Sequence, residues 1–185
     1  MSPSLEQLTA QFTRLIANAA PPAAVPAVGA GAPATPAATA STPVAVAAPA
    51  AAPASPILAV DYALKGYHLD MTVPAAQVVE SAQILDRAGF CLDTITCVDW
   101  LAQNEMEVVY DYLHFASPLR IVVRTRLPRA TPEVATIAGV FPGANWHERE
   151  THDFFGIQFV GHPNLKPFLL PEDADFHPLR KDYKP

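Results

Sequence analysis

The chain has 185 residues, of which 50% are hydrophobic, and a formal net charge of −6 at pH 7. An acidic balance without a cluster of Lys and Arg argues against binding to nucleic acid. No apolar run approaches the ~20 residues of a membrane-spanning helix, and the N-terminus lacks the basic region and apolar core of a signal peptide. We therefore expect a soluble cytoplasmic protein.

Composition divides the chain into four segments. Residues 1–18 carry apolar side chains at helical spacing, and residues 19–56 consist almost entirely of Ala, Pro, Val, Thr, Ser and Gly without a charge. The first pattern predicts an amphipathic helix. The second is typical of a disordered linker, because it offers little large apolar surface to bury. Residues 57–144 are expected to form an α/β domain, and residues 145–185 a signature helix with an extended, partner-docking tail.

The N-terminal helix begins with a capping-box pair, Ser4 and Gln7, and its apolar stripe contains Leu8 and Phe12. A helix of about 13 residues is marginal in water on its own. The sequence leaves two alternatives open: the helix frays, or it lays its stripe on a partner protein.

The domain is expected to contain four strands and two helices. Alternating apolar and polar side chains predict the strands, and helical apolar spacing that stops at Gly89 and at Pro142 predicts the helices. The predicted elements are a strand at 67–73, a helix after Pro74, strands at 90–98, 106–112 and 119–125, and a helix from Thr131. The expected fold class is α+β: a two-layer domain with a small, mostly antiparallel sheet and helices on one face, followed by an extended C-terminal tail.

The last two predicted strands form a hairpin pattern with a row of opposite charges. The acidic members are Glu105, Glu107 and Asp111, and the basic members are Arg120, Arg124 and Arg126. Cross-strand ion pairs are commoner in such an arrangement than an acid/base catalytic pair, so we expect a structural role.

Two cysteines, Cys91 and Cys97, lie in one predicted strand. Six residues of strand separate them by about 20 Å, which excludes a direct disulfide and a shared metal ion. Free thiols fit a reducing cytoplasm.

Residues 145–184 mix charges, histidines, aromatic residues and prolines without one period. Asn145 followed three residues later by Glu148 predicts a capping box, and Gly156 predicts the end of the helix. We therefore expect a short helix over Trp146 to Phe155.

This helix contains a sequence close to a zinc-protease motif, His147 and Glu148 followed by His152. The histidines are five residues apart rather than four, so at 3.6 residues per turn they lie about 140° apart around the helix and cannot bind one ion as that motif does. The remaining metal alternative combines His152, His162, His177 and Asp153. We expect these histidines to hydrogen-bond backbone instead. Without a nucleophile elbow, a Walker loop or a GxGxxG, we predict no catalytic, cofactor-binding or metal-binding residue on this chain.

Beyond His162 the sequence is rich in prolines, which prevent a long helix. The large apolar side chains of this extended segment are Leu165, Phe168, Leu169, Leu170, Phe176, Leu179 and Tyr183. A domain of this size covers only part of them, so the remainder is expected to face another protein. The alternative is an arm wrapped back on its own domain.

Several strings make a resemblance specific: ANWHERETHDFFGI, GHP, LLPED and HPLRKDY, with VDW and EVVYDYL upstream. They resemble the signature region of the 30-kilodalton subunit family of NADH:quinone oxidoreductase, respiratory complex I, whose bacterial member is the C subunit. The chain departs from that pattern at three places. His152 stands where tyrosine is common, Asn164 where aspartate is usual, and Lys166 with Pro167 replaces an Arg-Arg-like pair.

The resemblance implies a two-layer α/β domain with an extended tail, in a non-catalytic peripheral-arm subunit of a proton-translocating complex. That complex passes electrons from NADH through FMN and Fe-S clusters to quinone. The chain itself would carry no cofactor and would scaffold the quinone-site large subunit near the Fe-S subunits. It would be a peripheral protein on the cytoplasmic side of the cell inner membrane, associated with the membrane only through the complex. The alternative is the equivalent subunit of an energy-converting membrane-bound nickel–iron hydrogenase.

The resemblance also singles out partner-docking residues. They are Trp146, Glu148, Arg149, Glu150, Asp153, Phe155, Gly156, Gly161, His162, Pro163, His177, Pro178, Arg180, Lys181, Asp182 and Tyr183. We expect Glu148, Arg149, Glu150 and Asp153 to organise the junction of domain and tail, with Arg149 paired to Asp153 one helical turn away. Arg180, Lys181 and Asp182 are expected to anchor the end of the tail on the partner.

Overall fold

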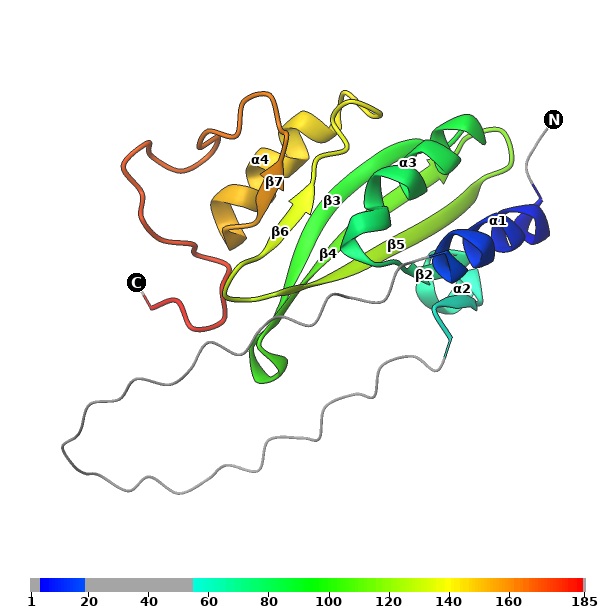
Figure 1. Cartoon of the computed structure of the whole chain (residues 1–185), viewed down its shortest axis with the longest axis horizontal. Coiled ribbons are helices and arrows are strands. Elements are labelled where there is room, and N and C mark those ends of the chain that lie inside the picture. The colour runs from blue at the N-terminus through cyan, green and yellow to red at the C-terminus, as the bar shows by residue number, and fades with distance from the viewer. Residues whose placement is uncertain (1–3, 19–54, 185) are drawn as a thin grey trace, which may run out of the picture.

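The computed structural model describes residues 4–18 and 55–184 (Figure 1). The predicted linker, residues 19–56, lies outside the described residues except for its last two. The main sheet has five strands in the order β1-β2-β5-β4-β3, in which only β2 and β5 run parallel. Their bounds are Ile57–Ala59 for β1, Leu69–Thr72 for β2, Cys91–Trp100 for β3, Glu105–His114 for β4 and Leu119–Pro128 for β5. The predicted α+β fold with a mostly antiparallel sheet is confirmed.

Helices cover one face of this sheet (Figure 1). They are α1 (Leu5–Ala17), α3 (Val78–Arg87, after a 3-10 turn at Ala75–Gln77) and α4 (Ala144–Phe155), while the short α2 (Tyr62–Lys65) precedes β2. Strand β4 shows why one face is covered: Met106, Val108, Tyr110 and Tyr112 are buried at every second position. Gly89 ends the α3 segment with φ of 83°, as predicted.

The opposite parity of β4 and β5 carries the predicted row of ion pairs. Arg120 Nε lies 2.9 Å from Asp111 Oδ1, and Arg126 Nε lies 3.0 Å from Glu107 Oε1. The other cross-strand pairs are Arg126 with Glu105 and Arg124 with Glu107. The predicted hairpin and its cross-strand ion pairs are therefore confirmed.

Cys91 and Cys97 are free thiols.

The helix predicted from Thr131 is wrong. Residues Glu133–Ala135 form strand β6, which pairs in parallel with β7 (Gln158–Val160). Pairing with a distant segment overrides the local helical spacing of Val134, Ile137 and Phe141. The amide of Ile137 donates to the Glu148 carboxylate at 2.8 Å, a partner that no local pattern reveals.

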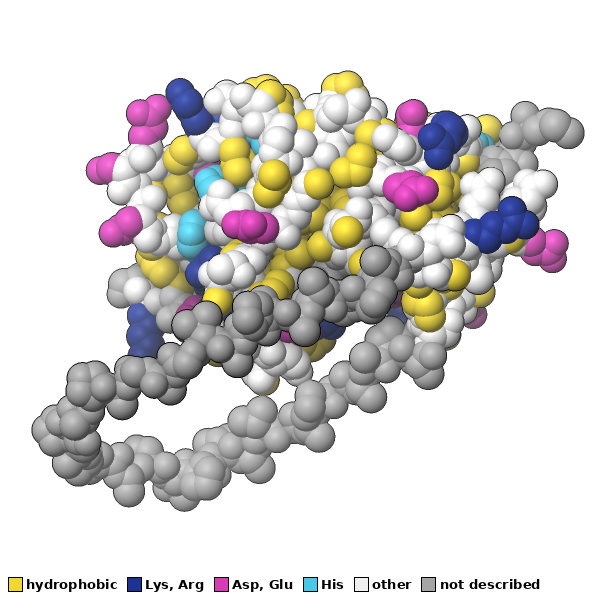
Figure 2. Space-filling model, in the orientation of Figure 1, with side chains coloured by type: hydrophobic (Ala, Val, Ile, Leu, Met, Phe, Trp, Pro, Cys, Tyr) yellow, Lys and Arg dark blue, Asp and Glu magenta, His cyan; other side chains and the backbone are white. Residues whose placement is uncertain are grey.

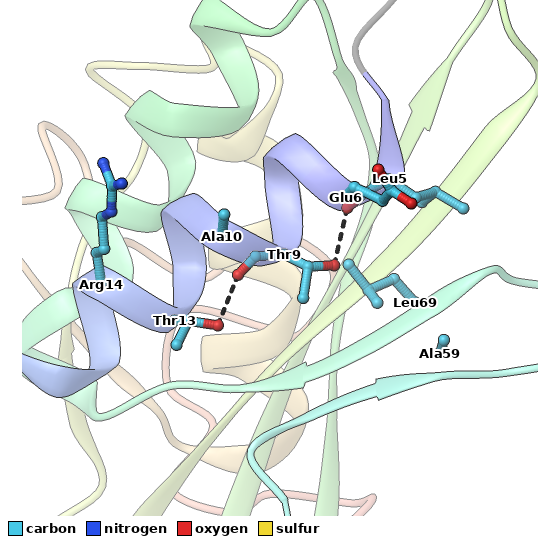
Figure 3. Close-up of a pocket in the computed structure, with 8 residues that line it drawn as sticks. All are labelled: Leu5, Glu6, Thr9, Ala10, Thr13, Arg14, Ala59 and Leu69. Atoms are coloured by element: carbon cyan, nitrogen blue, oxygen red, sulfur yellow. Dashed lines mark hydrogen bonds between the residues drawn. The ribbon is translucent and has the colours of Figure 1, made fainter.

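The N-terminal helix packs its apolar stripe on this chain's own domain rather than leaving it for a partner. Its capping box is confirmed, and Leu8, Phe12 and Leu15 are buried in the core of this chain's own domain. Gln77 Nε2 donates to the Leu15 carbonyl at 2.6 Å and so ties α1 to the start of α3. An apolar groove of about 600 Å³ remains beside α1, lined by Leu5, Glu6, Thr9, Ala10, Thr13, Arg14, Ala59 and Leu69 (Figure 3).

Residues 161–184, which we call the tail, contain neither helix nor strand and fold back toward the domain (Figure 1). In the part of the chain that the structure describes, no helix combines the length and the apolar character that a membrane crossing requires.

Candidate partner-docking site

Helix α4 connects the domain to the tail. It packs on β3, where Thr151 Oγ1 lies 3.4 Å from the Ile95 carbonyl. The predicted N-cap is wrong: α4 begins at Ala144 with Gly143 as its cap, so Asn145 lies inside the helix. The predicted end is confirmed, because Gly156 adopts the left-handed conformation with φ of 77°.

Glu148 does not close a capping box but points into the interior. Its side chain has no exposed surface, accepts hydrogen bonds from the Ile137 amide and the Thr136 hydroxyl, and lies 3.8 Å from His162 Nε2. Burial raises the pKa of Glu148 to about 7, although those two hydrogen bonds oppose the shift. Glu148 therefore fastens the segment after β6 to α4.

Asp153 holds the middle of the tail. Its Oδ2 atom accepts from the backbone amides of Phe168, Leu169 and Leu170, at 2.7, 2.7 and 3.3 Å. Three consecutive amides that would otherwise lack a partner are thus satisfied by one buried carboxylate.

Arg149 holds the tail segment that comes just before Phe168. Its Nε atom donates to the Lys166 carbonyl at 3.0 Å, and its Nη2 atom donates to the Pro167 carbonyl at 2.9 Å. The expected ion pair with Asp153 is therefore wrong, because each side chain binds tail backbone instead. Arg149 and Asp153 thus contact the tail, whereas Glu148 binds the segment after β6.

The end of the tail returns to the C-terminus of α4. Arg180 Nε donates to the Phe155 carbonyl at 2.7 Å, and the Leu179 amide donates to the Phe154 carbonyl at 3.2 Å. A Cβ atom on Gly156 would lie 2.5 Å from His177 Nε2 and closer still to Arg180 Nη2. Glycine is thus required here by both its backbone angle and the close approach of the tail.

The last anchor joins the tail to the far end of β3. Asp99 is buried and accepts from Arg129 Nε at 2.8 Å and from the Lys181 amide at 2.9 Å. Burial opposes ionisation, but these hydrogen bonds hold the pKa of Asp99 below its ordinary value. Asp182 pairs with the same Arg129 at 2.5 Å. Arg180, Lys181 and Asp182 thus anchor the tail on this chain's own domain, and their expected contact with a partner stays a prediction.

The three histidines of the metal alternative bind backbone, as predicted. The nearest carbonyl oxygens are that of Ile157 at 2.9 Å from His152 Nδ1, that of Asn145 at 3.1 Å from His162 Nε2, and that of Asp153 at 2.8 Å from His177 Nδ1. Burial lowers the pKa of His162 and of His177. Within residues 4–18 and 55–184, no group of three or more His, Cys, Asp or Glu side chains is placed to hold a metal ion.

The remaining predicted residues differ in exposure. Trp146 is 55% exposed on α4, Phe155 is buried at the end of the same helix, and Tyr183 stacks on Phe176 at 5.5 Å between ring centroids. Glu150 is half-buried, Gly161, Pro163 and Pro178 lie in turns of the tail, and His162 lies between the first two. Sequence reasoning missed Thr136 and Arg129, whose partners are distant in sequence.

Fold and site together define a two-layer α+β domain whose irregular tail is folded back and held by the side chains of one helix. Residues 71–185 match the family model described as the respiratory-chain NADH dehydrogenase 30 Kd subunit. The chain belongs to this family.

Its relatives are subunits of multi-subunit respiratory complexes. The chain is 46% identical over 92 residues to the NADH-quinone oxidoreductase C subunit of Roseiflexus sp. (strain RS-1), covering 49% of this chain and 53% of the relative. It is 42% identical over 94 residues to the F(420)H(2) dehydrogenase C subunit of Methanosarcina mazei, covering 50% and 60%. Thus the match spans little more than half the length of these relatives.

Solved structures with a similar fold include a chain from the membrane-bound sulfane sulfur reductase, an archaeal respiratory membrane complex, with a TM-score of 0.58 and 30% sequence identity. The match covers 63% of this chain and 71% of that chain.

Proposed function

We propose that this chain is a non-catalytic, peripheral-arm subunit of a proton-translocating NADH:quinone oxidoreductase, in which it scaffolds the large subunit that lines the quinone site, near the Fe-S subunits. It would lie on the cytoplasmic side of the cell inner membrane and contact the membrane only through the complex. The relatives, which are subunits of NADH-quinone oxidoreductases and a related dehydrogenase, support membership of such a complex.

One observation is the main support for the scaffolding role. The polar groups of α4 are used to hold the tail, through Arg149, Asp153 and the carbonyl of Phe155, while apolar side chains of the same region remain exposed. Figure 2 shows the face that carries α1, α3 and α4, with hydrophobic side chains open to solvent and acidic side chains along the outer edge of the tail. A surface of this composition suits a permanent neighbour rather than a substrate.

In this proposal, FMN, Fe-S clusters and quinone are held by partner subunits. Fe-S clusters are bound by Cys thiolates, commonly four per cluster. This chain has two cysteines, and burial raises the pKa of Cys97 to about 12, which disfavours the thiolate form.

A second candidate is the equivalent subunit of a related complex with a different electron donor. Similarity to a subunit of an F(420)H(2) dehydrogenase and to a chain of a sulfane sulfur reductase favours it. An energy-converting nickel–iron hydrogenase is a further member of this class of alternatives.

The test is to tag the chain and identify what co-purifies from detergent-solubilised membranes. We expect the quinone-site and Fe-S subunits together with flavin- and NADH-binding subunits. Recovery of a free monomer would contradict the proposal. Recovery of hydrogenase subunits, or of another donor module in place of the flavin and NADH-binding subunits, would establish the second candidate.

A further inference from the structure

The outer face of α4 and the adjoining part of the tail carry side chains that the fold leaves uncovered. Phe168 is 40% exposed and Leu169 is 54% exposed beside the exposed Trp146. The Trp146 and Phe168 rings lie 5.0 Å apart, and the Arg149 guanidinium lies 5.2 Å and 5.0 Å from their respective centroids. Lys166 is exposed next to them. We call Trp146, Arg149, Lys166, Phe168 and Leu169 the aromatic–arginine surface.

Hydrogen bonds within the chain hold the backbone of this surface and the Arg149 side chain. The amides of Phe168 and Leu169 are each bound by Asp153 at 2.7 Å, and the guanidinium of Arg149 is fixed by two carbonyl oxygens. A binding surface that is already ordered loses little conformational entropy on association. Trp and Arg are also the residues that most often dominate the energy of protein interfaces.

The positive charge of this surface is not neutralised within the fold. Arg149 donates to neutral carbonyl oxygens, and its hydrogen bonds use Nε and Nη2. Among the residues that the structure describes, the ion pairs involve His162 and the arginines at 120, 124, 126 and 129, but neither Arg149 nor Lys166. The chain as a whole is acidic, with a net charge of −6. The Arg149 guanidinium, held against two aromatic rings, can therefore bind a carboxylate from another molecule.

We propose that the aromatic–arginine surface binds a segment of a partner subunit in which a carboxylate lies beside apolar side chains. The carboxylate would face Arg149 and Lys166, and the apolar side chains would cover Trp146, Phe168 and Leu169. This inference rests on the proposed function, because membership of a complex supplies the partner.

Two other possible occupants of the aromatic–arginine surface have less support. A lipid surface would call for a cluster of basic residues, whereas this surface offers two cations. A second copy of the chain could offer its own exposed carboxylates, Glu172, Asp173 and Asp175. The relatives, however, are subunits of complexes built from different chains, which favours a different partner.

The direct test is a photo-cross-link in the intact complex. Leu169→benzoylphenylalanine is introduced into the tagged chain, the purified complex is irradiated, and the linked peptide is identified by mass spectrometry. We expect a peptide from another subunit with Asp or Glu within a few residues of the attachment point. Linkage to a second copy, to lipid or to a peptide without a carboxylate would overturn the proposal, as would the absence of a cross-link in complex that contains the variant.

A substitution tests the energetic contribution. Leu169→Asp places a charge where the partner's apolar side chains are expected, and we expect the fraction of chain found in the complex to fall about tenfold or more. The matched control is Phe115→Asp, at a hairpin position that is 75% exposed and belongs to no part of this surface. Unfolding of the isolated chain should be unchanged in both variants.

The outcomes separate the two proposals. If the wild-type chain co-purifies with the complex but Leu169→Asp assembles as well as Phe115→Asp, the surface is wrong and the scaffolding role stands. If the wild-type chain itself fails to co-purify with a respiratory complex, the proposed function fails.

Discussion

The open face of the main sheet and the α4–tail junction use the same charged residue types in different ways. On the sheet, Arg124 and Arg126 face Glu107, whose side chain is only 7% exposed, so charge meets charge across neighbouring strands. At the junction, Arg149 and Asp153 bind backbone carbonyls and amides of the tail. The sheet would keep its backbone hydrogen bonds without its ion pairs, whereas the tail depends on side chains for its shape.

The difference shows how an irregular segment becomes a defined surface. Backbone groups outside helices and strands must find partners, and a tail that contains several prolines supplies only some of them internally. Carboxylate and guanidinium groups on α4 supply others. Substitutions at the junction should therefore have large local effects, and those on the open sheet face small ones.

The largest effect is expected for Gly156→Ala. The new Cβ would lie 2.5 Å from His177 Nε2 at a φ of 77°, so backbone strain and a clash combine. We expect a loss of about 3 kcal/mol or more in the free energy of unfolding, measured by denaturant titration.

The matched control for this prediction is Gly66→Ala. Gly66 has the same φ of 77°, but nothing lies within 4 Å of the added Cβ. It should cost only about 1 kcal/mol. Equal losses of unfolding free energy at the two glycines would show that close contact with the tail does not restrict Gly156.

Glu148→Gln is expected to raise the free energy of unfolding by a similar amount, but only above neutral pH. Because the pKa of Glu148 is raised from 4.5 to about 7, the folded state binds more protons than the unfolded state between these values. This contribution to stability is complete below about pH 4.5 and is lost as pH rises through 7, amounting to about 3 kcal/mol. The glutamine variant should lack this slope and be the more stable form at pH 8. Parallel curves of unfolding free energy against pH for the two proteins would contradict the assignment.

Asp153→Ala should cost about 2 kcal/mol, because three amides lose a charged acceptor. Hydrogen exchange should accelerate at Phe168, Leu169 and Leu170 and remain slow in β4. Asp173→Ala, at an exposed position of the same tail, serves as control and should leave exchange unchanged. Acceleration in the control but not in Asp153→Ala would break the contrast between junction and surface.

The smallest effect is expected on the sheet. Glu105→Gln removes one side of a pair with Arg126 in which the two side chains are 43% and 34% exposed. Solvent screens such pairs, so we expect a change below about 0.5 kcal/mol in unfolding free energy. A loss comparable to that of Asp153→Ala would mean that the sheet also depends on its ion pairs.

Local patterns predicted the parts of the fold that local contacts determine. Alternation identified the hairpin of β4 and β5, and Gly89 and Gly156 marked turns that need positive φ. The motifs from Trp146 onward pointed to the family and to the junction residues before any contact was visible.

Long-range pairing was beyond the same reasoning. Strand β6 exists because it pairs with β7, a segment distant in sequence, and Glu148 binds the Ile137 amide just after the strand. The tail was expected to reach outward because its apolar side chains exceeded what a small domain can cover. The structure shows a combination: Asp99 and Arg129 bind its end to the domain, and Phe168, Leu169 and Leu179 stay exposed.

The most direct test of this account is hydrogen exchange at the amides of Phe168, Leu169 and Leu170 in the isolated, monomeric chain. If Asp153 holds the tail on its own domain, these amides should already exchange slowly in the monomer. In the complex their exchange should be slower still. Exchange in the monomer at the rate of an unstructured peptide, with protection appearing only in the complex, would contradict it.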